Sequence, residues 1–479
     1  MFSLYSVFSF FYLFSEDVVA LFSELFLVFF ISFFLLFGVF FGKSGRILCK
    51  AVTDLSVLVL FFVLVLYFFN PGFSYITAYS CFFEDESSWV FKTVLVFVCL
   101  FCLFLSTPYL ETEKVNHFEY PLLVLLSLLG MLGALTSNDY LCLYLSLELQ
   151  ALSFYTLASS IRSSEFATEA GLKYFVLGAV ASGFFLFGAS LLYGLTGCVR
   201  FTDLCLLLQH ISSADLEGIL LAFFVFFASF LFKIGAVPFQ SWVPDVYEGS
   251  PLCVTAIFAL LPKIALFGVM ARLLLSIYYS LFFSWQAPLL CCAVASFFWG
   301  SVAALGQGRI KRLLAYGSIS HSGFILLSLC SGTLYGVQGM ILYLITYVIS
   351  TSIVFGSLIG LRCFSKIRYL ADVAGLSFFH PGVSLAITGA LFSVAGIPPI
   401  LGFVGKFSVF FASLSSSLFI AAFLGVICSV ISTFYYLRIA RLLFFETAVF
   451  SLGSFTSFYV SRFPKELAIF TGAGVVILL

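Results

Sequence analysis

Uninterrupted apolar runs follow one another along almost the whole chain, and many of them are long enough to cross a bilayer. A helix needs about 20 such residues to span the ~30 Å hydrocarbon core. The runs are continuous and do not alternate with polar residues, so they indicate helices. Only 9% of the residues are charged, against about 25% in a soluble domain. We therefore predict an all-α integral membrane protein, because lipid offers the backbone no hydrogen-bond partners outside helices and closed barrels.

The pattern predicts about 14 transmembrane helices. The twelfth predicted span is too long for one straight helix and is expected to be broken. The expected spans are residues 18–41, 51–69, 88–106, 119–136, 139–161, 168–195, 217–239, 252–277, 288–305, 313–330, 336–360, 382–414, 417–444 and 466–479.

The distribution of basic residues supports this count. Lys and Arg prefer loops that face the compartment of synthesis. Of the 22 Lys and Arg, fifteen fall in loops on one predicted side and two, Arg200 and Arg272, on the other. The side that carries Lys43, Arg46 and Lys50 is therefore the inner side, and both termini are expected to face outward. The net charge of zero does not indicate a basic surface that would bind nucleic acid.

Six ionisable residues stand out inside predicted spans. A charge at the bilayer centre costs at least ~2.5–3.5 kcal/mol, so such residues indicate function. Burial lowers the pKa of a lysine in general and raises that of a glutamate, and a nearby opposite charge reverses both effects. A lysine facing a movable glutamate can therefore take up and release a proton. The six are Glu148, Lys173, Lys233, Lys263, Lys406 and His321.

Two of the lysines lie beside predicted helix breaks. Gly235 and Pro238 follow Lys233, whereas Gly396, Pro398 and Pro399 precede Lys406. Proline frees backbone carbonyls, and interrupted backbone at membrane depth occurs only inside protein or along a water-filled cavity. Discontinuous helices near the midplane are typical of transporters.

Structural interpretations stay open for several of these residues. Lys173 can extend its ammonium toward an interface, and His321 can be a buried histidine with satisfied hydrogen bonds. Lys92 and Glu24, near span ends, are predicted to be interfacial. A purely structural set of ion pairs fits poorly, because the lysines outnumber the acids. The thirteen cysteines, including Cys99 and Cys102, are predicted to be ordinary thiols without a metal or redox site.

A short internal repeat favours two related halves. Residues 231–238 and 391–398 share the order Leu-Phe, a variable residue, an aliphatic residue, two small residues, an aliphatic residue and Pro. Five spans separate them, and an odd number inverts the second copy. We predict three extra helices in residues 1–110, inverted five-helix repeats in residues 111–280 and 281–445, each with a discontinuous helix, and a last helix in residues 446–479.

Five segments resemble the antiporter-like subunit 2 of respiratory NADH:quinone oxidoreductase (complex I). They are FKIGAVPFQSWVPDVYEGSP, SLELQALSFYTLA, EAGLKYFVLGAVASGFFLFG, GRIKRLLAYGSISHSGF and AGIPPILGFVGKF. The similarity covers about residues 119–441. Gln240 departs from the histidine common at its position, and Leu252-Cys253 replaces a common Thr-Pro.

The resemblance implies the roles of the buried residues. Glu148 and Lys233 would form a switch pair, Lys263 would relay protons with His321 and Lys173 as further relay candidates, and Lys406 would lead to the outer side. NADH, FMN, iron–sulfur clusters and quinone would be bound by other subunits, so no cofactor site is expected in this chain. The expected partners are the other membrane-arm subunits, including sister antiporter-like subunits, and membrane lipids.

The resemblance implies the mitochondrial inner membrane, with the chloroplast thylakoid and the bacterial inner membrane as alternatives. Two other functions stay open: a Na⁺/H⁺ antiporter subunit of the related family, and an inert membrane scaffold in the same assembly. Sodium-dependent transport without a link to NADH oxidation would favour the first. Unchanged turnover after replacement of Lys233 and Lys406 would favour the second.

Overall fold

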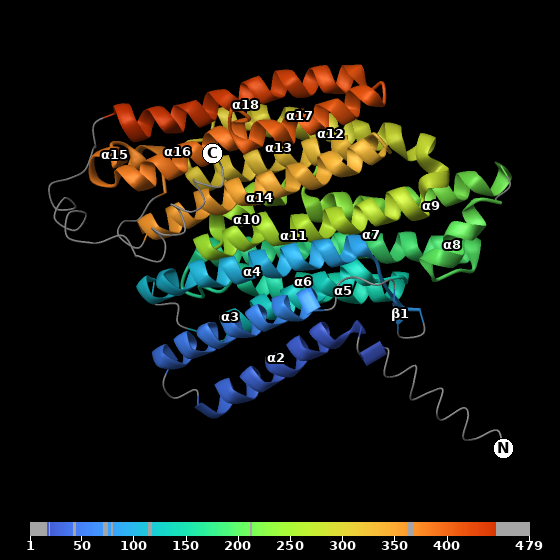
Figure 1. Ribbon diagram of the computed structural model, residues 1–479, viewed down its shortest axis with the longest axis horizontal. Helices are drawn as coiled ribbons and strands as arrows, with labels where there is room; N and C mark the ends of the chain where they lie inside the picture. The colour runs from blue at the N-terminus through green and yellow to red at the C-terminus, as the bar shows by residue number, and fades with distance from the viewer. Residues whose placement is uncertain are drawn as a thin grey trace.

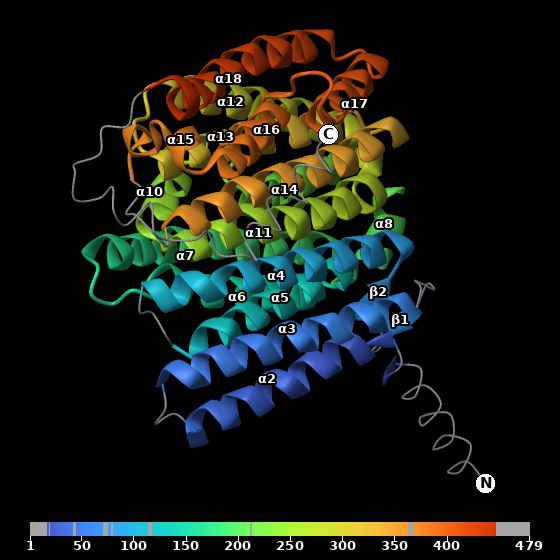
Figure 2. The same ribbon diagram turned by 60° about the vertical axis from the view of Figure 1, so that its left-hand side comes forward.

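Long helices with roughly parallel axes form one continuous bundle (Figure 1). The computed structural model describes residues 17–18, 20–41, 45–69, 75–77, 80–113, 117–210, 213–362 and 368–446. The first helices of the chain lie at one edge of the bundle and the last at the opposite edge (Figures 1 and 2). The predicted span 466–479 lies outside the described residues.

The first half of the chain contains three N-terminal helices and then a group around α11. A two-stranded antiparallel hairpin joins α3 to α4. The elements are α2 (Phe22–Phe41), α3 (Gly45–Phe69), β1 (Tyr75–Thr77), β2 (Phe82–Glu84), α4 (Glu86–Thr112), α5 (Glu119–Thr136), α6 (Tyr140–Ala158), α7 (Glu165–Thr196), α8 (Phe201–Leu208), α9 (Ser213–Ile234), α10 (Trp242–Gly249) and α11 (Leu252–Arg272).

The second half begins after a π-helical turn, Leu273–Ile277, and a 3₁₀ turn, Tyr279–Leu281. A further 3₁₀ turn covers Leu370–Val373. The helices are α12 (Phe282–Leu305), α13 (Ile310–Cys330), α14 (Leu334–Arg362), α15 (Leu376–Phe379), α16 (Pro381–Ala395), α17 (Leu401–Ser415) and α18 (Phe419–Phe445).

The predicted fold class is confirmed. Within the described residues, twelve helices are long and apolar enough to cross a membrane. The predicted break in span 382–414 lies between α16 and α17, at residues 396–400. Span 217–239 is also interrupted: α9 ends at Ile234, and the short helix α10 continues after the break. The exact division of the chain into repeats stays a prediction.

The two breaks have the same backbone pattern. Gly235 and Gly396 both adopt positive φ, 75° and 81°, and each is followed by a cis-proline peptide, at Pro238 and at Pro399. The corresponding amides Ala236 and Ile397 donate to carbonyls five residues earlier. The repeat alignment from sequence, which pairs Pro238 with Pro398, is therefore wrong by one residue. When the two breaks are aligned on Gly235 and Gly396, Pro238 corresponds to Pro399. Backbone conformation, and not similarity of side chains, gives this alignment.

Small residues allow close approach between helix pairs that carry buried polar groups. A Cβ atom on Gly130 of α5 would lie 2.7 Å from the backbone nitrogen of Gln150 on α6. A Cβ on Gly300 of α12 would lie 2.7 Å from the amide nitrogen of Ser320 on α13. Such contacts are the usual basis of tight helix packing in lipid, where hydrophobic burial between helices contributes little.

The N-terminal helices are held by a buried ionic cluster. The Lys92 ammonium lies 2.5 Å from carboxylate oxygens of both Glu24 and Glu84, and Tyr67 donates a hydrogen bond to Glu24 at 3.1 Å. The Lys92 side chain is only 2% exposed. Burial raises the pKa of the Glu84 carboxyl, outside the spanning helices, although Lys92 opposes this effect. The side chains of Lys92 and Glu24 are therefore covered by the folded chain and do not extend outward, whereas their predicted place near the membrane interface stays a prediction.

Lys92→Met should destabilise the protein. The substitution leaves two carboxylates of α2 and β2 without their cation, and breaking a buried pair typically costs about 3–5 kcal/mol. Thermal unfolding in detergent should show a clear loss of Tm. The control is Lys50→Met, because Lys50 is 62% exposed and lies 3.6 Å from Glu111. An equal Tm for both variants would contradict the structural role of the cluster.

Candidate functional site

Three lysines converge on the middle of the bundle from three different helices. Lys233 ends α9 at the first break, Lys263 lies midway along α11, and Lys406 lies in the second turn of α17, after the second break. Lys263 is 4% exposed and Lys406 is 5% exposed. Neither ammonium points outward to lipid.

Each of these ammoniums donates to a backbone carbonyl. Lys233 Nζ lies 3.4 Å from the carbonyl oxygen of Leu147, Lys263 Nζ lies 2.5 Å from that of Ser318, and Lys406 Nζ lies 2.7 Å from that of Ala395. A carbonyl accepts from a charged ammonium and, more weakly, from a neutral amine. Each lysine can therefore stay anchored while it loses its proton.

Glu148 lies close to Lys233 but is not paired with it. Lys233 bonds to the carbonyl of Leu147, the residue before Glu148 on α6, and the Glu148 charge acts electrostatically on Lys233. Among the described residues, no nitrogen–oxygen distance of 4.0 Å or less joins the two side chains. The Glu148 oxygen Oε1 is buried and has no hydrogen-bond partner within the described part of the chain. The structure thus shows the proposed pair in a separated arrangement.

Tyrosine hydroxyls lie beside Lys263 and beside both ring nitrogens of His321. The Tyr347 hydroxyl lies 3.3 Å from Lys263 Nζ. His321 Nδ1 lies 2.6 Å from the Tyr343 hydroxyl, and its Nε2 lies 3.3 Å from the Tyr436 hydroxyl. Both ring nitrogens of His321 thus have hydroxyl partners, which can donate or accept according to its protonation.

Small cavities lie along this row of side chains. One leaves about 30 Å³ for the centres of water molecules and is lined by both Lys233 and Lys263. A second, of about 20 Å³, is lined by Tyr347 and His321. A third, of about 10 Å³, continues from His321 to Ser393, beside the second break. One water molecule needs a volume of ~10–15 Å³ for its centre. Each of the three cavities is therefore large enough for about one or two water molecules.

Several buried polar atoms along the row require such waters. The side-chain oxygens of Gln150 and Ser393 have no hydrogen-bond partner among the residues that the structure describes. Buried polar groups are almost always satisfied, by protein or by ordered water. Gln240, at the first break, likewise has a buried Oε1 without a partner in the described chain.

Lys173 does not belong to this row. Its side chain is 43% exposed, and its ammonium lies 2.8 Å from Glu169 and 3.1 Å from Asp245 of α10. Arg312 of α13 also binds Asp245, at 2.7 Å. These ion pairs join α7, α10 and α13 at the end of the bundle where α7 and α13 begin, and the exposure of Lys173 fits its interfacial alternative better than a relay role.

The tyrosines are the functional candidates that the sequence interpretation missed. Tyr343 and Tyr347 are four residues apart on α14, so they lie on one face of that helix. Thr346, Ser350 and Thr351 lie close by in the same segment. This polar stripe within an apolar span was the available signal, but tyrosine is also common at membrane interfaces.

Comparisons with known proteins agree with the geometry. Residues 137–432 match the family model described as NADH:quinone oxidoreductase/Mrp antiporter, TM. The chain is 38% identical to NADH-ubiquinone oxidoreductase chain 2 of Marchantia polymorpha, over 91% of this chain and 90% of that protein. It is 39% identical to NADH-quinone oxidoreductase subunit N of Paramagnetospirillum magneticum, over 90% and 89% of the two chains.

Solved structures share the fold over nearly the whole chain. A chain of respiratory complex I from Thermus thermophilus, solved with bound aureothin, matches with a TM-score of 0.76 and 27% identity, over 95% of this chain and 97% of that one. A chain of the Mrp complex from Dietzia matches with a TM-score of 0.80 and 22% identity, over 95% and 93%. Because the sequence identity to the Mrp chain is only 22%, that match shows a shared fold and no more.

Tyr347→Phe should slow proton movement through the row without unfolding the chain. The change removes one hydroxyl beside Lys263 and keeps the ring, so we expect a loss of about 100-fold in proton translocation, the low end for a lost proton-transfer group. The measurement is proton uptake by vesicles that contain the assembled protein. Tyr335→Phe on the same helix is the control, because Tyr335 is exposed. Equal rates for the two variants would contradict a role for the Tyr347 hydroxyl.

Proposed function

The chain belongs to the NADH:quinone oxidoreductase/Mrp antiporter transmembrane family, and we propose that its row of buried lysines carries protons for a respiratory NADH:quinone oxidoreductase. Its relatives are chain 2 and subunit N of that enzyme. The function is that of a proton-translocating, antiporter-like membrane subunit. The observation that carries the proposal is that Lys263 and Lys406 are buried, Lys233 is partly buried, and all three are bonded to carbonyls.

The path runs from the Glu148–Lys233 pair, through Lys263 and His321, to Lys406. The cavity between Lys233 and Lys263 supports the first transfer. The hydroxyl of Tyr347 and the cavities at His321 support the next. The helix α17 of Lys406 runs from the second break toward the outer side, as the alternation of spans requires. Lys406 therefore delivers the proton outward.

Movement of Glu148 relative to Lys233 is the driving step. Two unit charges at 4 Å interact by about 4 kcal/mol at an effective dielectric constant of 20, and the interaction weakens with distance. Moving one proton against 100 mV costs about 2.3 kcal/mol. Bringing the carboxylate into contact holds the proton on Lys233, and separating the two groups releases it toward Lys263. A modest conformational change therefore suffices.

The redox chemistry belongs to partner subunits. We expect NADH, FMN, iron–sulfur clusters and quinone to be bound elsewhere in the assembly. Sister antiporter-like subunits and other membrane-arm subunits are the expected neighbours, and lipids cover the remaining apolar surface. The mitochondrial inner membrane is the proposed location, supported by the high phenylalanine content, 66 of 479 residues, which fits an AT-rich organelle genome. Fractionation of the source cells tests this location against a thylakoid or bacterial membrane.

Lys233→Arg and Lys233→Ala should both abolish proton pumping. Arginine keeps the positive charge but does not release its proton, so Lys233→Arg separates loss of proton transfer from loss of charge. The assembly should still form and bind its partners. Proton pumping coupled to NADH oxidation is measured in vesicles, with the exposed residue Lys50 changed to Ala as the control. Pumping at the wild-type rate in Lys233→Arg would rule out the lysine path.

The alternative function is a Na⁺/H⁺ antiporter subunit, and sodium dependence discriminates between the two. Our proposal predicts that proton translocation by the assembly requires NADH oxidation and is unchanged when Na⁺ is replaced by choline. Vesicles without added Na⁺ and with matched ionic strength provide the measurement. Sodium-driven proton exchange in the absence of NADH would favour the antiporter.

A further inference from the structure

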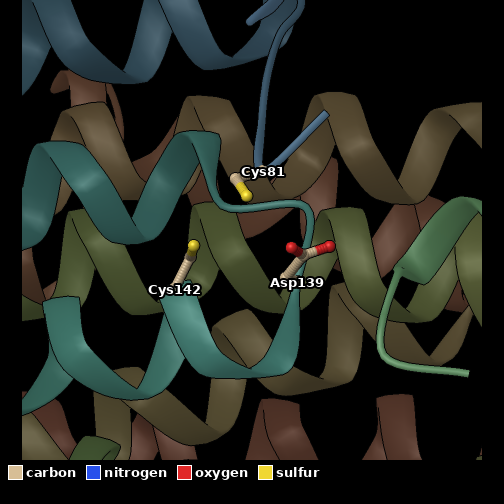
Figure 3. A group of neighbouring side chains, drawn as sticks. All are labelled: Cys81, Asp139 and Cys142. Atoms are coloured by element: carbon tan, nitrogen blue, oxygen red, sulfur yellow. The ribbon is translucent and has the colours of Figure 1, made fainter. Parts of the chain in front are cut away.

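Two cysteines and an aspartate face one another at the outer end of the bundle (Figure 3). Cys81 lies in the turn between β1 and β2, Asp139 immediately precedes α6, and Cys142 lies in the first turn of α6. One ligand atom of each residue lies within 4.8 Å of those of the other two. Among the described residues, no other group of His, Cys, Asp and Glu side chains meets this condition.

The Asp139 carboxylate lacks a partner for one of its oxygens. The residue is only 8% exposed, yet Oδ1 has no hydrogen-bond partner within the described residues. The Cys81 thiol is hydrogen-bonded to the Asp139 carboxylate and to the Cys142 thiol, but these bonds leave Oδ1 without a donor. A buried carboxylate oxygen without a donor is costly, so the group fits a cation. Arg200 acts electrostatically at this end of the bundle and pairs with Asp139 through the backbone.

Backbone hydrogen bonds fix the three groups in place. The amide of Asn138 donates to the carbonyl of Cys81 at 2.8 Å, and the Asn138 side-chain amide donates to that of Ser80 at 2.9 Å. Phe82 of β2 forms a bridge with Ser137. The turn that carries Cys81 is thus attached to the start of α6. The ligand set is preorganised and need not form by folding around an ion.

We propose that Cys81, Asp139 and Cys142 bind one zinc ion at the outer face, with a fourth coordination position open to water. Thiolate and carboxylate oxygens are normal zinc ligands, at about 2.3 Å and 2.0–2.2 Å. Tetrahedral ligands at these distances are about 3.5–3.8 Å apart, which falls within the 4.8 Å that bounds the spacing of the three ligand atoms here. Binding releases the two thiol protons to water, and the dication offsets two of the three negative charges that the thiolates and the buried carboxylate then carry.

A disulfide between the two cysteines explains less. The outer side of a respiratory membrane permits thiol oxidation, so Cys81 and Cys142 could form a bond there. That bond would remove two potential ligands and leave Asp139 Oδ1 as it is. Zinc accounts for all three side chains. The ion would also fix the first turn of the helix that carries Glu148, six residues or about 9 Å further along α6.

Zinc content of the purified full-length chain tests the proposal. The chain is equilibrated with Zn²⁺, freed of loose metal by gel filtration, and analysed by mass spectrometry for metal and by X-ray absorption for the ligands. We expect one zinc per chain with sulfur in its coordination shell. Cys142→Ser and Asp139→Asn should weaken binding by more than about 10-fold, since even outer-shell changes cost this much.

Cys291→Ser is the matched control, because Cys291 is an exposed cysteine on α12 outside the cluster. It should keep the zinc. Thermal unfolding in the presence of chelator shows whether each variant folds, so loss of metal is separable from loss of structure. Equal zinc content in folded Cys142→Ser, or zinc without sulfur ligands, would overturn the proposal. A Cys81–Cys142 disulfide in the native assembly, detected by mass spectrometry without reductant, would overturn it as well.

Discussion

The central interaction is the hydrogen bond from a buried lysine to a backbone carbonyl. Lys233, Lys263 and Lys406 all have such a partner, whereas Lys92 lies between two carboxylates. A carboxylate stabilises the charged ammonium strongly, and a carbonyl does so less. The first three lysines can therefore change protonation, and the fourth holds helices together. The same residue type thus serves two purposes in one bundle, and its partner decides which.

The helix breaks make this arrangement possible. Ala395 ends α16, so its carbonyl has no helical donor and accepts from Lys406 instead. Gly396 allows the lysine stem to pass closely, because any Cβ there would collide with it. Breaks in lipid-facing backbone would be too costly, but these lie inside the bundle beside small polar cavities. The broken helices, the buried lysines and the water-sized spaces therefore depend on one another.

The spans, the helix breaks and the buried lysines could be predicted from the sequence. Features that depend on tertiary contacts could not. Apolar run length predicted the spans, and the residues around Gly235 and Pro399 predicted the breaks, because both features act locally. The burial of Lys92 was missed because Glu24 is 68 residues away and Glu84 lies on a hairpin. The separation of Glu148 from Lys233 depends on the relative positions of α6 and α9. No local sequence pattern predicts that geometry. The contact of Cys81 with the start of α6 likewise cannot be predicted from local sequence.

Proton transfer along this row requires a continuous hydrated path. A structure of the whole assembly that resolves water molecules tests for this path most directly. We predict ordered waters in the cavity between Lys233 and Lys263 and at His321, each within hydrogen-bond distance of the next polar group. The chain of waters and hydroxyls should reach the break beside Lys406. Dry apolar gaps between these groups, or lysine ammoniums that face lipid in the assembled complex, would contradict the account.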